Sequence, residues 1–415
     1  MPRPDTTVRI AFDLAAGGVG NFFTLNDPVK GTLNTAPFGL AGDILEDVTA
    51  DTQSITVRRG RSRELERFQA GSLTVNLDNS GRKYDPAAGT AITPYGASMR
   101  PRKAITVTSA GKPVFSGVVE DWDLSYSLDG DHVASVKATD GFVFLANQEI
   151  TPHTTTSQKT GERIDAILDR PEIDWPSGKR DIADGIATLQ ADAIGGTANA
   201  QPVGALEYLL RVDTAEQGAL FIGADGRLVF RDRSDLQILS STVFADDGSG
   251  IPFSAIDASY GSEELRNRIT VTRLNGGTAT AIGTASVAAY GAIDYEIRDT
   301  LFSTDTQAQQ LADVILARYE EPLLRIDGLE VNTLELADAE VNEVLDLELG
   351  SLVQVKYTPS GIGDQIYQCV RIDSIEHSVG PVEHRIKFYF SEGETPALVL
   401  NSTTFGILDT NTLGF

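Results

Sequence analysis

Histidines are the first residues to consider for chemistry, because a catalytic triad or a zinc site usually includes at least one imidazole. The sequence has only four, which are His132, His153, His377 and His384. His377 and His384 lie on either side of Gly380-Pro381, which predicts a turn, so a hairpin would bring the two rings together. No third ligand accompanies them, and we therefore expect no metal site.

Acidic residues supply another route to catalysis, since a glycosidase needs only two suitably placed carboxylates. The most suggestive cluster is Glu120-Asp121-Trp122-Asp123, in which the tryptophan could stack against a sugar. It lies within an alternating strand pattern, which turns neighbouring side chains to opposite faces and leaves the acids in solvent. Residues 245–252, ADDGSGIP, could mimic a calcium loop but do not continue the EF-hand pattern. We interpret both segments as solvated.

Signatures of other enzyme classes are absent from the sequence. It has no GxSxG, HExxH or GxxxxGK(S/T) motif, and no dinucleotide-binding GxGxxG followed by an acidic partner for the ribose. Cys369, the single cysteine, permits no internal disulfide and is predicted to be a buried apolar residue of a strand. We therefore expect no catalytic residue, no cofactor and no metal, and hence no enzyme.

Length and composition describe a folded chain with several cores. The 415 residues predict two to four domains, and the 41% apolar and 22% charged fractions are ordinary for globular proteins. No apolar stretch approaches the roughly 18 residues of a membrane helix, and MPRPDTTVRI lacks the apolar core of a signal peptide. The net charge of -25 opposes general binding to nucleic acid. These features predict a protein that is made and assembled in a cytosol.

Basic residues nevertheless gather in two short segments, RRGRSRELERF and MRPRK. The arginines of these segments are Arg58, Arg59, Arg61, Arg63, Arg67, Arg100 and Arg102. Local basic patches on an acidic protein suit electrostatic docking to an acidic neighbour, including another copy of the same chain. A solvated strand edge with scattered arginines is the alternative, and we carry these residues forward as candidate subunit-interface residues.

Residues 1–150 are predicted to form a first β domain. Segments such as SITVRRG, GSLTVNLDN, KAITVTSAG and HVASVKATD alternate apolar with polar residues, which is typical of half-buried strands. The connections between them are short and rich in Asn, Asp and Gly, which are turn residues. Many strands with short connections favour an antiparallel barrel or sandwich over a parallel sheet.

Residues 151–235 have a different pattern, which predicts a small α+β domain. Thr160 is placed to cap a short helix over GERIDAILD, and a second helix is expected from about Pro202. The segment ALFIGADGRLVFRDR contains two alternating runs joined at Asp225-Gly226, which is a hairpin signal.

Residues 236–395 return to strand patterns and are predicted to form a second β domain. The patterns include NRITVTRL, LEVNTLEL, SLVQVKY, YQCVRIDSIEHSV and EHRIKFYF. One helix is expected at about 305–320, with Thr304 and Gln307 forming a capping box. The fold class is therefore mainly β, with two β-barrel or sandwich domains on either side of the α+β insert.

Residues 396–415 contain no periodic pattern of core residues and are predicted to form a C-terminal arm. Their ending, Leu400 to Phe415, repeats the N-terminal segment Leu25 to Leu40 without a gap at Leu, Asn, Gly, Leu, Thr and Gly. We hypothesise that both copies are clips that dock on β surfaces through apolar anchors and backbone pairing. Leu400, Leu408 and Phe415 are the candidate anchors of the second copy.

The segments Ile55 to Pro86 and Arg100 to Trp122 resemble minor tail proteins of siphophages that infect actinobacteria. More broadly, the chain is similar to the tail-hub family. The similar features are an Arg-rich turn, an LDN turn, a Tyr-Asp-Pro loop, an Arg-Pro-Arg strand entry and a Phe-Ser-Gly-Val strand. GALFIGADGRLVFRDR, AQQLADVILARYEEPLLRI and LDLELGSLVQVKY extend the resemblance over most of the chain.

This resemblance implies a structural protein of the virion tail tip. Hub proteins of this kind are trimers in which each subunit contributes two tube-type β-barrel domains, so that three chains match a sixfold tube. The implied partners are the distal tail protein, the tail tube, the tape measure and other minor tail proteins or fibres, with genomic DNA only as passing cargo. A hexameric distal tail protein, and a tail protein that binds or hydrolyses cell-wall carbohydrate near Trp122 and Trp175, remain as alternatives.

Overall fold

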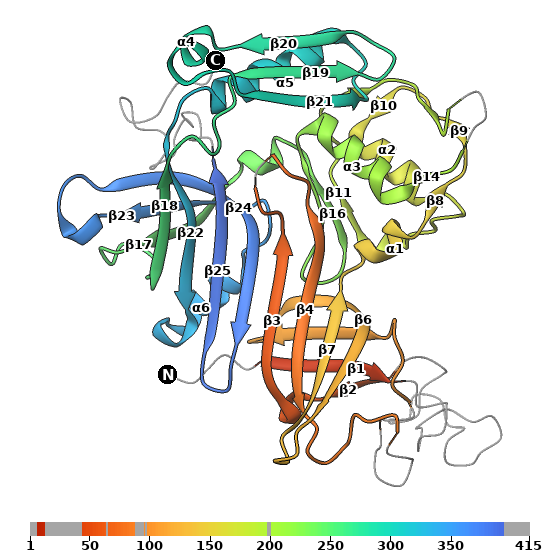
Figure 1. Ribbon diagram of the computed structural model, residues 1–415, viewed down its shortest axis with the longest axis vertical. Helices are drawn as coiled ribbons and strands as arrows, with labels where there is room; N and C mark the ends of the chain where they lie inside the picture. The colour runs from red at the N-terminus through yellow and green to blue at the C-terminus, as the bar shows by residue number, and fades with distance from the viewer. Residues whose placement is uncertain are drawn as a thin grey trace.

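The computed structural model describes residues 6–12, 44–63, 65–87, 95, 98–196 and 201–393. Within this part of the chain the protein is mainly β, as predicted, and its largest element is a 13-stranded sheet (Figure 1). The first half of this sheet contains β1 (Thr6–Phe12), β2 (Ile44–Asp47), β3 (Thr52–Gly60), β4 (Gln69–Asp78), β5 (Ala104–Ser109), β6 (Lys112–Tyr126) and β7 (His132–Thr139). The second half contains β17 (Leu239–Ala245), β18 (Ala255–Tyr260), β22 (Leu324–Asn332), β23 (Leu352–Tyr357), β24 (Ile366–Val379) and β25 (His384–Glu392).

Alternation of apolar and polar residues produces the strands of the first half. Along β4 the buried residues are every second one, from Gly71 through Leu73, Val75 and Leu77. Because successive side chains of a strand point to opposite faces, this pattern buries one face of the sheet. Val57 of β3 and Val136 of β7 lie on the same buried face and are fully inaccessible.

Strand β6 bends so that it belongs to two parts of the first half. Its beginning pairs with β5, whereas the stretch from Val118 onward pairs with β7, and a bulge separates Val119 from Asp121. Bulges add local twist and let a strand change direction. Gly117 lies at the bend, where a Cβ would come within 2.1 Å of the Thr139 carbonyl oxygen, so no larger residue fits.

The two halves of the large sheet are joined edge to edge. β24 pairs with β3 in antiparallel register from Ile55 opposite Val379 to Gly60 opposite Ser374. Gly60 has a φ of +115°, and a Cβ there would meet the Asp373 carbonyl oxygen at 2.1 Å. Only glycine satisfies both conditions. We call this pairing, with the side chains that cross it, the main seam.

The first half continues into an insert formed from short elements and three helices. The helices are α1 (Phe142–Ala146), α2 (Thr160–Leu168) and α3 (Ala205–Glu216). The strands are β8 (Glu149–Ile150), β9 (His153–Thr154), β10 (Gln158–Lys159), β11 (Arg180–Ile182), β12 (Thr188–Leu189), β13 (Ala193–Ile194), β14 (Val203–Gly204), β15 (Ala219–Ile222) and β16 (Leu228–Arg231). The predicted hairpin at Asp225-Gly226 is confirmed, because β15 and β16 pair around it and Gly226 has a positive φ.

The starts of the two predicted helices differ in detail from expectation. Thr160 does not cap α2. Instead, the Lys159 backbone N–H donates to Glu162, and the Thr160 hydroxyl donates to the buried Glu216 carboxylate. Helix α3 begins three residues after Pro202, at Ala205. Contacts with distant residues also contribute, since Thr160 contacts Glu216 of α3 and the Ala205 backbone N–H donates to the Gln148 carbonyl oxygen, and a local pattern does not reveal these.

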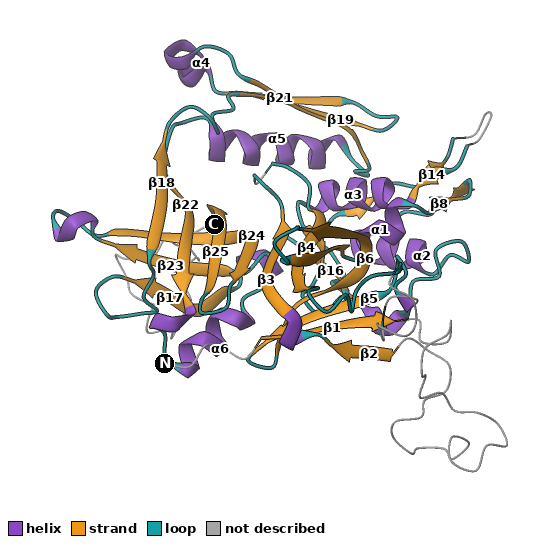
Figure 2. Cartoon of the chain, turned by 60° about the horizontal axis from the view of Figure 1, so that its bottom comes forward, coloured by secondary structure: helices purple, strands orange, loops and turns teal. Residues whose placement is uncertain are grey.

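A separate three-stranded sheet lies between β18 and β22 in the sequence. It contains β19 (Arg268–Arg273), β20 (Thr278–Ile282) and β21 (Asp294–Thr300), together with α4 (Thr284–Tyr290) and α5 (Asp305–Tyr319). Helix α5 lies between this small sheet and the rest of the molecule (Figure 2). The predicted capping box is confirmed, since the Thr304 hydroxyl accepts from the Gln307 backbone N–H. The NRITVTRL pattern predicted the strand β19, but it did not predict that this strand belongs to a separate sheet with β20 and β21.

Helix α6 (Asp338–Asp346) is a further element that the sequence reading missed. Its buried residues Val341, Val344 and Leu345 follow the helical spacing of i, i+3 and i+4, so the signal was present. Among the described strands, no pairing closes either half of the large sheet into a barrel. The described residues form one open, bent and mainly antiparallel sheet, in which β17 and β23 are parallel, with smaller sheets and helices on it.

Candidate functional site

The arginine cluster of residues 58–67 lies at the main seam. Nη1 of Arg59 is 2.7 Å from Oε1 of Glu348, and the Arg59 side chain is only 4% exposed. Nη2 of Arg61 is 2.9 Å from Oδ1 of Asp373, which is also buried. Both ion pairs join the first half of the sheet to the second. Buried charges are stable only when they are paired in this way.

The remaining arginines of the cluster are more exposed. The Arg58 guanidinium lies 5.8 Å from the centre of the Tyr389 ring on β25. Arg63 forms an exposed ion pair with Glu263. Arg67 is exposed and lines a pocket that is described below. The cluster is therefore divided, and Arg58 and Arg67 are exposed members that form no ion pair with a described residue.

The second basic segment lies at the entry of β5. Arg100 is exposed and donates to its neighbour, the Met99 carbonyl oxygen. Arg102 is also exposed, and its guanidinium lies 5.8 Å from the Phe144 ring centre. Leu400, Leu408 and Phe415, the predicted anchors of the arm, lie outside the described residues, as does the N-terminal copy of the repeat.

His377 and His384 meet across the β24–β25 hairpin, as predicted. Nδ1 of His377 is 3.1 Å from Nε2 of His384, and both side chains are buried. Burial lowers the pKa of His377 well below its usual value, and His384 and Arg59 act in the same direction. Ser109 of β5 lies beside the pair. In the described part of the chain, no group of three or more His, Cys, Asp or Glu side chains is arranged to hold a metal ion.

The acidic cluster around Trp122 does not form a site. Asp121 and Asp123 are exposed, and Asp123 is paired with Lys137 at 2.7 Å. Trp122 instead packs within an aromatic cluster, where its ring lies 6.0 Å from the rings of Phe12 and Tyr84. The predicted calcium-like loop is a solvated turn in which Asp247 accepts from the Ser249 backbone. Cys369 is buried, as predicted.

Several strand edges of the large sheet are open, because β2, β17 and β18 each pair with one described strand and part of β6 does so too. β18 pairs only with β22 among the described strands, and all of its residues except Ile256 are exposed. The far part of β6, Glu120 to Tyr126, pairs only with β7 within the described chain. Tyr260 at the end of β18 is 72% exposed, and Tyr126 at the end of β6 is 50% exposed. Open edges offer unpaired backbone groups to another strand.

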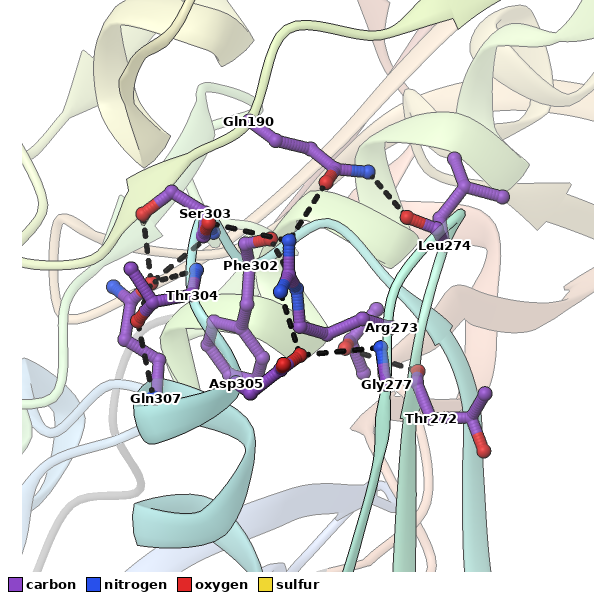
Figure 3. Close-up of polar contacts among 11 residues, drawn as sticks. Gln190, Thr272, Arg273, Leu274, Gly277, Phe302, Ser303, Thr304, Asp305 and Gln307 are labelled. Carbon is purple, nitrogen blue, oxygen red and sulfur yellow. Dashed lines mark hydrogen bonds and ion pairs between the residues drawn. The ribbon is translucent and has the colours of Figure 1, made fainter.

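The insert and the small sheet are joined by a polar contact that we call the cap seam (Figure 3). Gln190 donates from Nε2 to the Leu274 carbonyl oxygen at 2.7 Å and accepts from Arg273 at 3.3 Å. Arg273 also pairs with Asp305 at 2.6 Å and donates to the Phe302 carbonyl oxygen. The insert and the small sheet therefore pack together, although about 80 residues separate Gln190 from Arg273 in the sequence.

A central pocket of about 410 Å³ lies where these parts meet. Its lining comes from the β3–β4 connection, α3, the segment after β16, β21, α5 and β24. Asp213 of α3 is buried in it, and this burial raises the pKa of its carboxyl to about 7. Arg61 opposes that shift. Sequence reasoning missed this pocket because its residues are far apart in the chain.

Comparison with known proteins finds this fold in two tail proteins of known structure. No protein-family model and no curated protein matches the sequence. Two solved structures share the fold over nearly the whole chain. One is the 43 kDa tail protein of prophage MuSo2 from Shewanella oneidensis, with a TM-score of 0.55 and 13% identity over 94% of this chain and 97% of that one. The other is a tail protein from Neisseria meningitidis MC58, with a TM-score of 0.58 and 12% identity over 93% of this chain and 96% of that one.

These similarities concern the fold, because sequence identity is low. They extend across both halves of the large sheet, the insert and the small sheet, so the arrangement as a whole is shared. Within the described residues, no helix has the length and apolar character to cross a membrane.

Proposed function

We propose that this protein is a structural subunit of a bacteriophage tail tip, a hub that forms a ring, and that it has no catalytic role. The fold shared with two tail proteins supports the class of protein. The observation that carries the ring is the main seam, where two β halves of one chain pair edge to edge and leave other strand edges open, among them β18 and the far part of β6.

The number of copies follows from the same geometry. If each half acts as one tube-type domain, one chain supplies two adjacent positions of a pseudo-sixfold ring, and three chains complete it. In such a ring, β18 of one copy would pair with the open part of β6 in the next, so that the sheet closes between copies. A hexameric distal tail protein would instead need one such half per chain.

The ring would lie beneath the tail tube, with DNA passing through its centre. A net charge of -25 suits a channel wall that does not retain DNA. The partners would be the distal tail protein, the tail tube, the tape measure and other minor tail proteins or fibres, and the protein would be assembled in the host cytoplasm. The proposed domains are residues 1–150, 151–235 and 236–395, followed by the arm at 396–415.

The open edges give the experiment that tests the ring. Native mass spectrometry of purified protein should give three times the 44.4 kDa chain mass. Ser259→Pro, which removes a backbone donor from β18, should convert the trimer to monomer without loss of the fold. Ser259→Ala, which keeps the backbone N–H at the same position, is the matched control and should remain trimeric. A wild-type monomer that is absent from isolated tails contradicts the proposal.

The carbohydrate alternative has a separate test. Incubation of the protein with purified cell wall should release no soluble sugar. Glu120→Gln and Asp121→Asn should leave this result and the oligomeric mass unchanged. Sugar release that either variant abolishes would replace the structural proposal by an enzymatic one.

A further inference from the structure

The central pocket collects basic residues in an otherwise acidic protein. Its lining includes five arginines but only two carboxyl residues, Glu66 and Asp213, whereas the whole chain has a net charge of -25. The arginines are Arg61, Arg67, Arg233, Arg318 and Arg371. Part of this charge is balanced from outside the lining, since Arg61 pairs with Asp373 and Arg233 lies 3.5 Å from Glu216. The exposed Arg67 has no such partner in the described chain, so the pocket favours an acidic occupant.

A buried carboxyl group adds to the polar side of the pocket. Asp213 is 7% exposed, and its Oδ1 atom has no hydrogen-bond partner among the described residues. An unsatisfied polar atom of this kind is costly unless something completes its hydrogen bonds. With a pKa of about 7, the Asp213 carboxyl is partly protonated at neutral pH, which leaves the lining more positive. The groups that face it are Arg61 and Arg67 from the first half and Glu216 from its own helix.

Part of the pocket lining is apolar. Helix α5 contributes Leu311, Val314 and Ile315, and Val314 is 48% exposed. Leu65 and Ile297 extend this apolar part from the β3–β4 connection and from β21. The pocket therefore fits a segment that carries both a carboxylate and apolar side chains.

The described chain leaves the large sheet beside this pocket. Glu392, the last residue of β25, lies opposite Val370, and the next residue of β24, Arg371, lines the pocket. Glu392 also lies 3.5 Å from Arg325, which donates to the Arg318 carbonyl oxygen and lies over the Tyr319 ring. Arg318 and Tyr319 are both lining residues. The end of β25 at Glu392 is therefore one side-chain contact, through Arg325, away from the pocket lining.

The segment that follows has the required chemistry. Residues 394–415 lie outside the described part of the chain, contain Glu394 and Asp409, and include no lysine or arginine. Their first apolar run, Ala397 to Leu400, begins four residues after Gly393 and lies within about 25 Å of it even when fully extended.

We propose that residues 394–415 dock in the central pocket of their own chain, with the run Ala397 to Leu400 on α5 and an acidic side chain beside Arg67 and Arg318. Docking would cover the apolar part of the lining and link the second half of the sheet to the insert and the small sheet. The proposal does not depend on the ring, because it holds for a single chain.

Photo-crosslinking of the full-length protein tests this docking. Leu400 is replaced by p-benzoylphenylalanine, and equal amounts of ¹⁴N- and ¹⁵N-labelled protein are mixed before irradiation. Mass spectrometry then distinguishes crosslinks within a chain from those between chains. The expected result is crosslinks within one chain to Leu311, Val314 or Leu65.

Charge reversal provides the matched comparison. Arg67→Glu combined with Arg318→Glu should lower the yield of these crosslinks by about tenfold. Arg100→Glu with Arg102→Glu makes the same change of charge at residues that do not line the pocket, and should leave the yield unchanged. Val314→Asp is a second pocket variant if the first unfolds, as judged by circular dichroism. Crosslinks between chains only, crosslinks spread over the surface, or a yield insensitive to both pocket variants would overturn the proposal.

Discussion

The main seam and the cap seam join distant parts of the same chain by different means. The main seam is a backbone ladder of six residue pairs, reinforced by the buried ion pairs of Arg59 with Glu348 and of Arg61 with Asp373. The cap seam has a single backbone bridge, between Leu189 and Phe302, and side-chain contacts of Gln190 with Arg273 and with the Leu274 carbonyl oxygen. Removing one partner of a buried ion pair lowers the free energy of unfolding strongly, whereas an exposed ion pair contributes little to it.

This difference teaches which part of the molecule is fixed and which can adjust. A seam that resists opening would suit the ring proposed above, because the angle between the two halves would set how that ring closes. A polar and partly solvated seam lets the insert and the small sheet shift without disturbing the sheet. The following predictions test that contrast, beginning with the largest expected effect.

Gly60→Val should have the largest effect. The new Cβ would meet backbone atoms of Asp373 and Ser374, and the positive φ is one that valine disfavours. We therefore expect the free energy of unfolding to fall by more than about 4 kcal/mol, and the protein to be insoluble. Urea denaturation or soluble yield measures it. Gly111→Val is the control, because its φ is also positive but nothing lies within 4 Å, and it should cost only about 1–2 kcal/mol. Equal losses would show that the seam itself is not tightly packed.

Arg59→Met should be the next most severe. It leaves Glu348 without its partner at the main seam, and we expect a loss of about 3 kcal/mol in the free energy of unfolding. Arg63→Met removes the exposed pair with Glu263 and should cost less than about 1 kcal/mol. Chemical denaturation of both variants gives the comparison. Similar losses in the two variants would contradict the assignment of Arg59 to a buried seam.

Acid should weaken the main seam through His377. Its pKa in the folded protein is below the unfolded value of 6.5, so the unfolded chain binds more protons at low pH. The contribution of His377 to the free energy of unfolding is fully present above pH 6.5. It is lost as the pH falls from 6.5 through the lower pKa of the folded protein. The urea midpoint should fall between about pH 7.5 and about pH 5. His377→Gln should remove part of this dependence and His153→Gln should not, whereas an unchanged slope in the first variant would refute the mechanism.

Arg273→Ala should have the smallest effect on global stability, about 1 kcal/mol. It removes the contacts with Gln190 and Asp305, so the insert and the small sheet should separate more readily. Hydrogen exchange should rise at residues 188–190 and 301–303, whose backbones pair across the cap seam, and stay constant in β3 and β24. A uniform rise over the whole chain would indicate that the two seams are equally tight.

Sequence reasoning predicted the elements whose signals are local. Period-two alternation predicted β3 to β7, and turn chemistry predicted the hairpin at Asp225-Gly226. The helix at 305–319 followed from Thr304 and Gln307, because a capping box needs only neighbouring residues. The contact of His377 with His384 followed from a tight turn between them. In each case the partners lie within a few residues of each other.

The seams and the pocket could not be predicted, because they join residues that are far apart in the chain. The arginine cluster indicated a charged surface, yet Arg59 and Arg61 turn inward to Glu348 and Asp373. An alternating pattern predicts which face of a strand is buried, but it does not predict which other strand pairs with that strand. For that reason β19 was predicted as a strand, while its place in a separate small sheet was not.

The pairing of β3 with β24 also sets the order in which the protein can be made. The Arg59 carbonyl oxygen and the Ser374 hydroxyl bond across 315 residues of chain. At cellular rates of translation, β3 would wait about 15–60 s for its partner strand to be synthesised. During that time an unpaired edge is exposed to other nascent chains, so a chaperone or a slow local folding step would protect it. Pairing of this edge therefore requires synthesis of the chain through β24, so the large sheet can be completed only late in translation.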